Sequence, residues 1–135
     1  MDGATRKTEG IHHVGLSVSA LDEAASFFCD LLGFRIVRRW PDYPALAVND
    51  GKTTLTLWRV ASPDRCVPFD RRNNEGLHHL ALGVESPEQL AALHRNMVAR
   101  AVAVEFAPEL RADGGAIHMM CNIPGGPRLE LVCPI

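Results

Sequence analysis

Two short stretches of this chain are nearly the same and decide its fold: I-H-H-V-G-L-S-V at residues 11–18 and L-H-H-L-A-L-G-V at residues 77–84. They lie 66 residues apart, and each surrounds a His-His pair with apolar residues, as a largely buried β-strand does. A strand repeated in this way predicts two copies of one structural unit. The rest of the sequence can therefore be compared copy by copy.

A helix is expected after each repeated stretch. In the first copy Ser19 is a candidate N-cap, with Asp22 three residues later at the second position of a capping box. In the second copy Ser86 is the candidate N-cap, and Pro87 follows at the first helical position. Gly33 is expected to end the first helix, because glycine readily adopts the left-handed conformation found at helix ends.

Three strands are expected after each helix, since β-branched and apolar runs there are separated by turn residues. They are predicted at 34–40, 45–48 and 53–60 in the first copy, and at 102–106, 116–121 and 128–133 in the second. The predicted fold class is therefore α+β, with two tandem β-α-β-β-β modules.

The same comparison predicts how the chain is divided. We expect modules at 11–60 and 77–133, joined by a linker at 61–76 that contains polar residues, proline and glycine. Residues 11–135 then form a single domain, and residues 1–10 are expected to be a flexible N-terminal segment.

Composition excludes several classes of function. The 135 residues carry a net charge of −2, so the excess of Lys and Arg typical of nucleic-acid-binding proteins is missing and no nucleic-acid partner is expected. No apolar run is long enough to span a membrane, and the polar first residues hold no signal peptide, so we expect a soluble cytoplasmic protein. The four cysteines form no C-x-x-C pair, which favours reduced, mostly buried thiols over catalytic ones.

Histidines and one carboxylate interrupt the apolar strands at related places. Neighbouring side chains of a strand point to opposite faces, so one histidine of each pair can line a cavity. His13 and His79 occupy the same place in the two copies, and Glu130 lies between two leucines of the last strand. Each alone is more often an ordinary structural residue. Together, two imidazoles and a carboxylate suit a divalent transition metal that also binds a substrate.

These features resemble the vicinal oxygen chelate superfamily, which includes glyoxalase I, extradiol dioxygenases, fosfomycin-resistance enzymes and bleomycin-binding proteins. The H-H-V and H-H-L openings, the closing P-G-G-P-R-L-E-L and the doubled module carry the resemblance, over about 11–132. It implies that the modules form a cupped mixed sheet. It also implies one divalent ion per site (Fe, Mn, Ni, Zn or Co), held by His13, His79 and Glu130.

Thr56 departs from part of that superfamily. It falls where glyoxalase I and the epimerases have a fourth ligand, Glu or Gln, and a threonine cannot act as their carboxylate base. We expect Thr56 to point toward the metal without binding it directly. The remaining two-histidine, one-glutamate set is shared with extradiol dioxygenases and fosfomycin-resistance transferases. The tyrosine that extradiol enzymes carry ten residues before the ligand glutamate is Met120 here.

The resemblance implies a metal-dependent enzyme that acts on a small molecule chelating the metal through neighbouring oxygens, as a lyase, isomerase or ring-cleaving dioxygenase. The alternatives are a ligand-sequestering protein of the bleomycin-resistance type and a fosfomycin-resistance-type transferase. A homodimer is implied as well. Whether His13 joins His79 and Glu130 from the same chain or from the partner remains open.

Other side chains are candidates for roles around this site. His118 is the best acid–base candidate if it points into the cup, because its ordinary pKa is near neutral, and the opposite orientation is equally compatible. Alternation places Arg35 and Arg39 on one strand face, where a solvated surface is favoured over an anion site. Trp40 and Trp58 are interpreted as core or interface residues, with a pocket for an aromatic or acyl group as the alternative.

Overall fold

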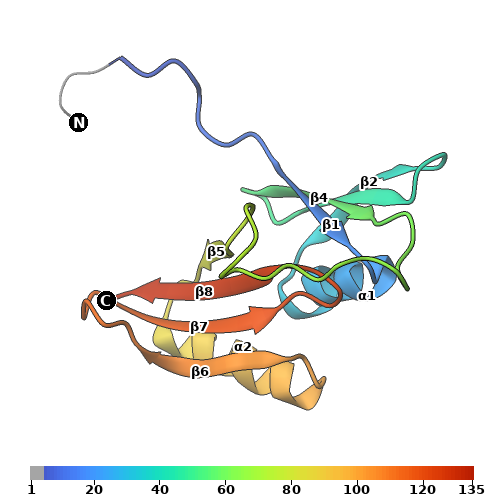
Figure 1. Ribbon diagram of the computed structural model, residues 1–135. Helices are drawn as coiled ribbons and strands as arrows, with labels where there is room; N and C mark the ends of the chain where they lie inside the picture. Colours follow the sequence, from blue (N-terminus) through green and yellow to red (C-terminus); the bar gives the residue numbers. More distant parts are fainter. Residues whose placement is uncertain (1–4) are drawn as a thin grey trace.

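The computed structural model describes residues 5–135 and consists of two similar modules (Figure 1). The first contains β1 (Val14–Val18), α1 (Leu21–Ser26), the π-helical segment η1 (Phe27–Leu31), β2 (Arg35–Trp40), β3 (Ala45–Asn49) and β4 (Thr54–Arg59). The second contains β5 (Leu80–Gly83), α2 (Pro87–Ala99), β6 (Val104–Leu110), β7 (Ala116–Asn122) and β8 (Arg128–Pro134). The predicted α+β class with two tandem β-α-β-β-β modules is confirmed.

Each module forms its own four-stranded mixed sheet. The strand orders are β1-β4-β3-β2 and β5-β8-β7-β6. In both sheets the first strand is parallel to the last, and the remaining pairs are antiparallel. The last strand of each module is therefore central, and the first strand is left at an edge.

The two sheets share one hydrophobic core, which the helices complete. On the central strands, Leu55 and Leu57 of β4 and Leu129 and Leu131 of β8 are almost fully buried in it. Because side chains alternate, Thr56 and Glu130 point to the opposite side. We call the side of each sheet turned away from this core its outer face. Among residues 5–135, the helices pack on the core side of the sheets, and no helix of a module covers the outer face of its own sheet.

The two helices differ at their first residues, because only α2 has a side-chain cap. In α2 the Ser86 hydroxyl accepts a hydrogen bond from the Gln89 amide at 3.1 Å, as predicted. The prediction for Ser19 is wrong, because α1 begins at Leu21 and Ala20 is its N-cap residue. Ser19 instead binds the other module, where its amide and its hydroxyl both donate to the Gly125 carbonyl, at 2.8 and 3.3 Å. A tertiary contact has displaced the local capping bond.

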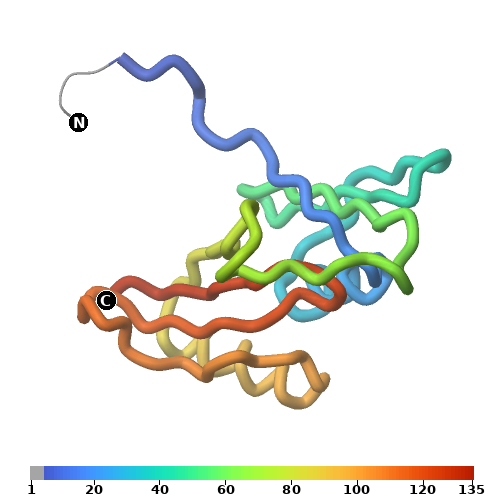
Figure 2. Tube along the Cα trace, in the orientation of Figure 1, coloured from blue at the N-terminus to red at the C-terminus, as the bar shows by residue number. Residues whose placement is uncertain are grey.

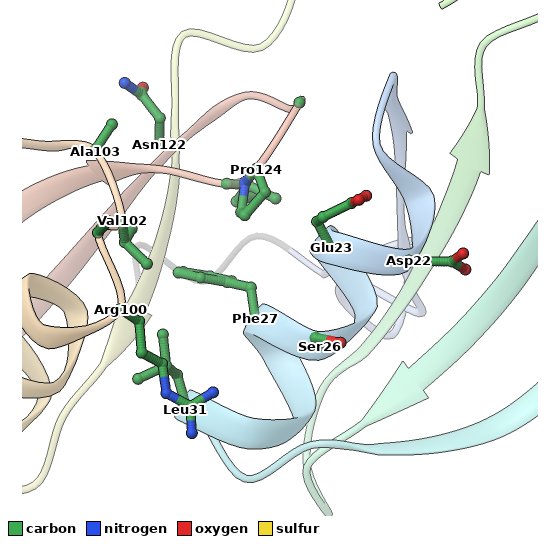
Figure 3. Close-up of a pocket in the computed structure, with 13 residues that line it drawn as sticks. Asp22, Glu23, Ser26, Phe27, Leu31, Arg100, Val102, Ala103, Asn122 and Pro124 are labelled. Atoms are coloured by element: carbon green, nitrogen blue, oxygen red, sulfur yellow. The ribbon is translucent and has the colours of Figure 1, made fainter.

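The turn before β8 forms the tightest contact between the modules. Gly125 has a φ of +63°, and a β-carbon there would lie 2.6 Å from both the Ala20 amide nitrogen and the Ser19 hydroxyl. Beside this contact is a groove of about 650 Å³, into which the Phe27 ring of η1 points toward Pro124 (Figure 3). The groove lies at the module junction, and none of the predicted metal ligands lines it.

The segment before β1 leaves the body of the protein (Figure 1). It has no regular secondary structure between residues 5 and 13, and Ile11 within it is 83% exposed. The predicted flexible segment at 1–10 also includes residues 1–4, which lie outside the described residues. The linker joins β4 to β5 without a helix or strand of its own (Figure 2). In the part of the chain that is described, no helix is both long and apolar enough to cross a membrane.

Candidate metal centre

Two predicted ligands, His79 and Glu130, meet on the outer face of the second module. Glu130 of β8 pairs with Ala81 of β5, and His79 lies two residues before Ala81, on the same side of the sheet. His79 Nε2 is 3.3 Å from Glu130 Oε1, and the Glu130 side chain is only 14% exposed. The repeat and the alternation of the strands thus bring an imidazole next to a shielded carboxylate.

Neighbouring hydrogen bonds fix which nitrogen of His79 carries a proton. Arg128 is held by Glu105 through two hydrogen bonds, of 2.9 and 3.0 Å, and its Nη1 lies 3.4 Å from His78 Nδ1. Since a guanidinium can only donate, His78 Nδ1 is an acceptor. His79 Nδ1 lies 2.8 Å from that same atom and must therefore be its donor. With Nδ1 as a donor, the nitrogen of His79 that faces Glu130 is Nε2, and it can bind a metal ion when it is deprotonated.

The state of His78 agrees with this assignment. Loss of hydration lowers the pKa of His78, and the positive charges of Arg128, His79 and Arg71 lower it further. A neutral His78 remains able to accept hydrogen bonds near neutral pH. Hydrogen bonds from Arg128, with the charges of Arg128 and Arg71, also lower the pKa of Glu105, which keeps the carboxylate ionised and Arg128 in place.

The geometry of His79 and Glu130 fits a divalent ion. His79 Nε2 and Glu130 Oε1 lie 3.3 Å apart, and a metal ion can take the place of the proton between them. Ligand atoms bound at about 2.1 Å to one transition-metal ion lie about 3.0 to 3.4 Å apart, depending on the coordination geometry. These two residues therefore satisfy the distance that metal binding requires.

His13 occupies the corresponding place in the first module. It lies two residues before Gly15 of β1, which pairs with Thr56 of β4, and its Nδ1 is 2.9 Å from His12 Nδ1, as in the His78–His79 pair. Within residues 5–135 of a single chain, however, no three His, Cys, Asp or Glu side chains are arranged to hold a metal ion. One chain thus supplies the His79–Glu130 pair on one outer face and His13 at the edge of the other.

His118 also points to the outer face of the second module. It lies on β7, and its Nδ1 is 2.6 Å from Glu130 Oε2, while the Phe106 ring packs against its imidazole at 4.9 Å between ring centres. Of the two orientations compatible with the sequence, the structure has the one that faces the predicted ligands. Each oxygen of Glu130 thus has its own neighbour, Oε1 toward His79 and Oε2 toward His118. His118 can fix the orientation of the carboxylate that binds the metal.

Replacing His118 should weaken metal binding without abolishing it. We expect His118→Leu to lower Mn²⁺ affinity by about 10- to 100-fold, the range usual for a residue that orients a ligand, and His118→Gln to restore part of it because the amide can still donate to Glu130. Electron paramagnetic resonance of free Mn²⁺ measures this affinity. His94→Gln, on the helix covering the other side of the sheet, is the control. Unchanged affinity in His118→Leu would contradict the orienting role, and complete loss would make His118 a ligand.

Thr56 lies on the outer face of the first module and is buried, with 7% of its surface exposed. Its hydroxyl oxygen accepts a hydrogen bond from Trp58 Nε1 at 3.0 Å, and a β-carbon at Gly15 would lie 3.1 Å from it. Glycine at position 15 therefore leaves room for Thr56 between the strands. The hydroxyl proton of Thr56 remains available to a ligand on this face. That Thr56 does not bind the metal directly stays a prediction.

Two other sets of side chains, an arginine–aspartate pair and the cysteines, form no hydrogen bond or ion pair with Glu130 among the described residues. Arg111 and Asp113 pair with each other at 2.8 Å in the exposed turn between β6 and β7. All four cysteines are free thiols. Cys121 and Cys133 are buried, and burial raises the pKa of the Cys121 thiol to about 12, which makes it a poor nucleophile. Cys66 is exposed, against the expectation of mostly buried thiols.

Sequence reasoning missed the residues that support His79. Strand alternation predicts only that His78 points to the face opposite His79, and it gives no role to Glu105 or Arg128. Arg128 could have been noticed, because it lies two residues before Glu130 on the same strand face. Glu105 could not, since its contact with Arg128 depends on the pairing of three strands.

Comparisons with known proteins agree with this architecture. A family model described as Glyoxalase/Bleomycin resistance protein/Dioxygenase superfamily matches residues 10–131. The chain is 28% identical over 144 residues to 2-epi-5-epi-valiolone epimerase from Actinomyces sp, with 90% of this chain and 78% of the epimerase covered. It is 22% identical over 123 residues to catechol-2,3-dioxygenase from Bacillus subtilis (strain 168), with 83% of this chain covered but only 42% of the dioxygenase.

Solved structures share the fold at lower identity. A glyoxylase/bleomycin resistance protein/dioxygenase domain from Frankia sp. EAN1pec superposes with a TM-score of 0.81 at 19% identity, covering 95% of this chain and 93% of the other. The match to the family model extends over nearly the whole chain and includes both His-His openings. The protein belongs to the Glyoxalase/Bleomycin resistance protein/Dioxygenase superfamily, the vicinal oxygen chelate proteins of the sequence analysis.

Proposed function

We propose that this protein is a metal-dependent enzyme whose substrate binds the metal through two neighbouring oxygens. The observation that carries the proposal is the His79–Glu130 pair, an imidazole nitrogen 3.3 Å from a shielded carboxylate oxygen. The relatives named above include an epimerase and a dioxygenase, which supports an enzyme without selecting the reaction.

We further propose that the third ligand, His13, comes from a second copy of the chain in a homodimer. Within one chain the two modules pack through a shared core, and their outer faces are not brought together around one metal group. His13 lies directly before β1, at the end of the N-terminal segment in which Ile11 is 83% exposed. A two-fold dimer would place the first module of one chain against the second module of the other, and form two equivalent sites.

Unpaired edges and exposed apolar side chains support such a dimer. The edge strands β1 and β5 directly follow the two His-His pairs and have one side free of backbone partners within their sheets. Val67 and Phe69 in the linker and Leu77 before β5 are 84%, 37% and 41% exposed, respectively. Apolar residues grouped along unpaired edges commonly mark an interface.

The chain's own residues would divide the work as follows. His79 and Glu130 bind the metal ion. His78, held by Arg128, accepts a hydrogen bond from His79 Nδ1 and fixes its ring. His118 orients the Glu130 carboxylate. The bound divalent ion supplies Lewis-acid stabilisation of a developing oxyanion, or redox chemistry if it is iron. His118 is within 2.6 Å of Glu130, so its imidazole is the titratable group placed to accept or return a proton of a substrate on this face. Thr56 can offer its hydroxyl from the opposite module.

Elemental analysis after native purification tests the enzyme proposal. We expect about one divalent transition-metal ion per chain, together with a mass in light scattering of twice 14.8 kDa. A protein that contains no metal, and that takes up no Mn²⁺, Fe²⁺ or Zn²⁺ when titrated, would contradict the proposal and favour a ligand-sequestering protein of the bleomycin-resistance type. A monomer at micromolar concentration would contradict the dimer.

A further inference from the structure

An irregularity in β2 changes which arginines share a face. Arg35 pairs with Asn49 and Ile36 with Val48, but the next pair is Arg38 with Ala47, so Val37 is an extra residue in the strand. Such a bulge shifts the alternation by one residue. Arg38 therefore lies on the outer face together with Arg35, whereas Arg39 pairs with the core residue Leu46. The prediction that Arg35 and Arg39 share a face is wrong for this reason.

An aromatic stack lies beside Arg38 on the same face. Trp40, Ala45 and Trp58 are aligned across β2, β3 and β4, and the two indoles stack over the small alanine at 5.5 Å, with an interplanar angle of 25°. Tyr43 packs edge-on against Trp58 at 5.0 Å. The Arg38 guanidinium lies 4.8 Å from the centre of the Trp40 ring, which holds it at one end of the stack.

The other end of the stack reaches the candidate site. Trp58 donates its indole proton to Thr56, and Thr56 pairs with Gly15, two residues from His13. From Thr56, the pairing continues through Ala47 to Arg38, so Thr56 and Arg38 are two strand spacings apart, about 10 Å. Ala45 and Ala47 of β3 have small side chains, so little protrudes from the sheet between Thr56 and Arg38. The stack and Arg38 thus border the place that, in the proposed dimer, faces the partner's second module.

The positive charge on this face is not compensated. None of the ion pairs formed within residues 5–135 involves Arg35 or Arg38, and both are exposed. Arginine next to half-buried indoles is suited to an oxyanion on an aromatic frame, because the guanidinium fork pairs with two oxygens while the rings contact the frame. Tyr43, which is 51% exposed, extends the aromatic surface outward.

We infer that the substrate is a planar aromatic anion, with its carboxylate or phosphate read by Arg38 and Arg35 and its ring lying against the Trp40–Trp58 stack. This assignment rests on the proposed function in taking the bound molecule to be the substrate. Binding to the stack itself does not depend on the metal. The inference agrees with the alternative interpretation from the sequence, in which Trp40 and Trp58 line a pocket for an aromatic group. Arg38 is then a specificity-determining residue.

The chain has only two tryptophans, and both are in the stack, so their indole N–H signals in a ¹H–¹⁵N NMR spectrum report on it directly. The full chain is titrated with four probes, as purified and again after EDTA treatment: phenylacetate, phenyl phosphate, 2-phenylethanol and cyclohexylacetate. We expect phenylacetate or phenyl phosphate to shift both indole signals in both preparations. The neutral alcohol and the non-aromatic acid should bind about tenfold more weakly.

Two substitutions on the same strand provide the matched comparison. Arg38→Gln should weaken binding of the better aromatic anion about tenfold, whereas Arg39→Gln, on the opposite face, should leave it unchanged. Equal effects of the two substitutions, equal binding of phenylacetate and cyclohexylacetate, or equal binding of phenylacetate and 2-phenylethanol would each overturn the inference. So would the absence of any indole shift at millimolar probe. A protein without metal would still show the indole shifts, so failure of the proposed function is distinguishable from failure of this inference.

Discussion

Glu130→Gln should lower Mn²⁺ affinity at least about a thousandfold, because it removes the only carboxylate of the predicted ligand set and its negative charge. The side chain is 14% exposed, so water cannot easily replace the missing charge, and the two neighbouring imidazoles would otherwise face an ion alone. Folding should be preserved, since glutamine has the same shape and can still accept a hydrogen bond from His118. Titration of Mn²⁺ followed by electron paramagnetic resonance measures the change.

Glu109→Gln is the matched control for this substitution. Glu109 pairs with His118 across β6 and β7 but is exposed, and no ion pair of the described residues involves it. Loss of its charge should leave Mn²⁺ affinity nearly unchanged. If both variants bound Mn²⁺ as well as the unchanged protein, the assignment of Glu130 as a ligand would be refuted.

Gly125→Ala should be the most destabilising single-atom change at the junction of the modules. The new β-carbon would lie 2.6 Å from the Ala20 amide nitrogen and the Ser19 hydroxyl, and the φ of +63° is itself unfavourable for alanine. Relief of the clash would also lengthen the 2.8 Å hydrogen bond from the Ser19 amide to the Gly125 carbonyl. We expect the free energy of unfolding to fall by about 3 kcal/mol or more, measured by urea denaturation.

Gly114→Ala separates the clash from the backbone strain. Gly114 also has a positive φ, of +75°, but nothing lies within 4 Å of the position its β-carbon would take. Its replacement should cost only about 1 kcal/mol, the usual penalty for alanine in the left-handed region. Similar losses in the two variants would show that the tight contact of Gly125 with Ala20 does not hold the modules together.

Much of the fold could be predicted because the repeat appears twice in local sequence. The paired His-His stretches and the run of three strands are local patterns that the structure has in both modules, and the cap at Ser86 is present in the second. The repeat and the family resemblance singled out His79 and Glu130, and the parallel pairing of β5 with β8 in the structure brings them to one face. The same reasoning left His13 as a residue of the other module.

The features that sequence reasoning got wrong depend on contacts between distant segments. Ser19 fails as a cap because its hydroxyl donates to the carbonyl of Gly125, far away in the chain. The bulge at Val37 arises from how β2 pairs with β3, and it decides that Arg35 shares a face with Arg38 and not with Arg39. Strict alternation has no means of detecting an inserted residue. A local pattern therefore predicts elements well, but it predicts side-chain partners only where no bulge or distant contact intervenes.

In the proposed dimer, each metal site takes His13 from one chain and His79 and Glu130 from the other. This arrangement is tested by the metal content of heterodimers made by co-expressing a His13→Ala chain and a Glu130→Ala chain with different affinity tags, and purified over both tags. Each single variant alone should form homodimers with weak metal binding. The heterodimer should regain one intact site, shown by one tightly bound Mn²⁺ per pair of chains, because its unmutated His13 and Glu130 lie on different chains. A heterodimer that binds Mn²⁺ no better than either homodimer would contradict a site shared between chains.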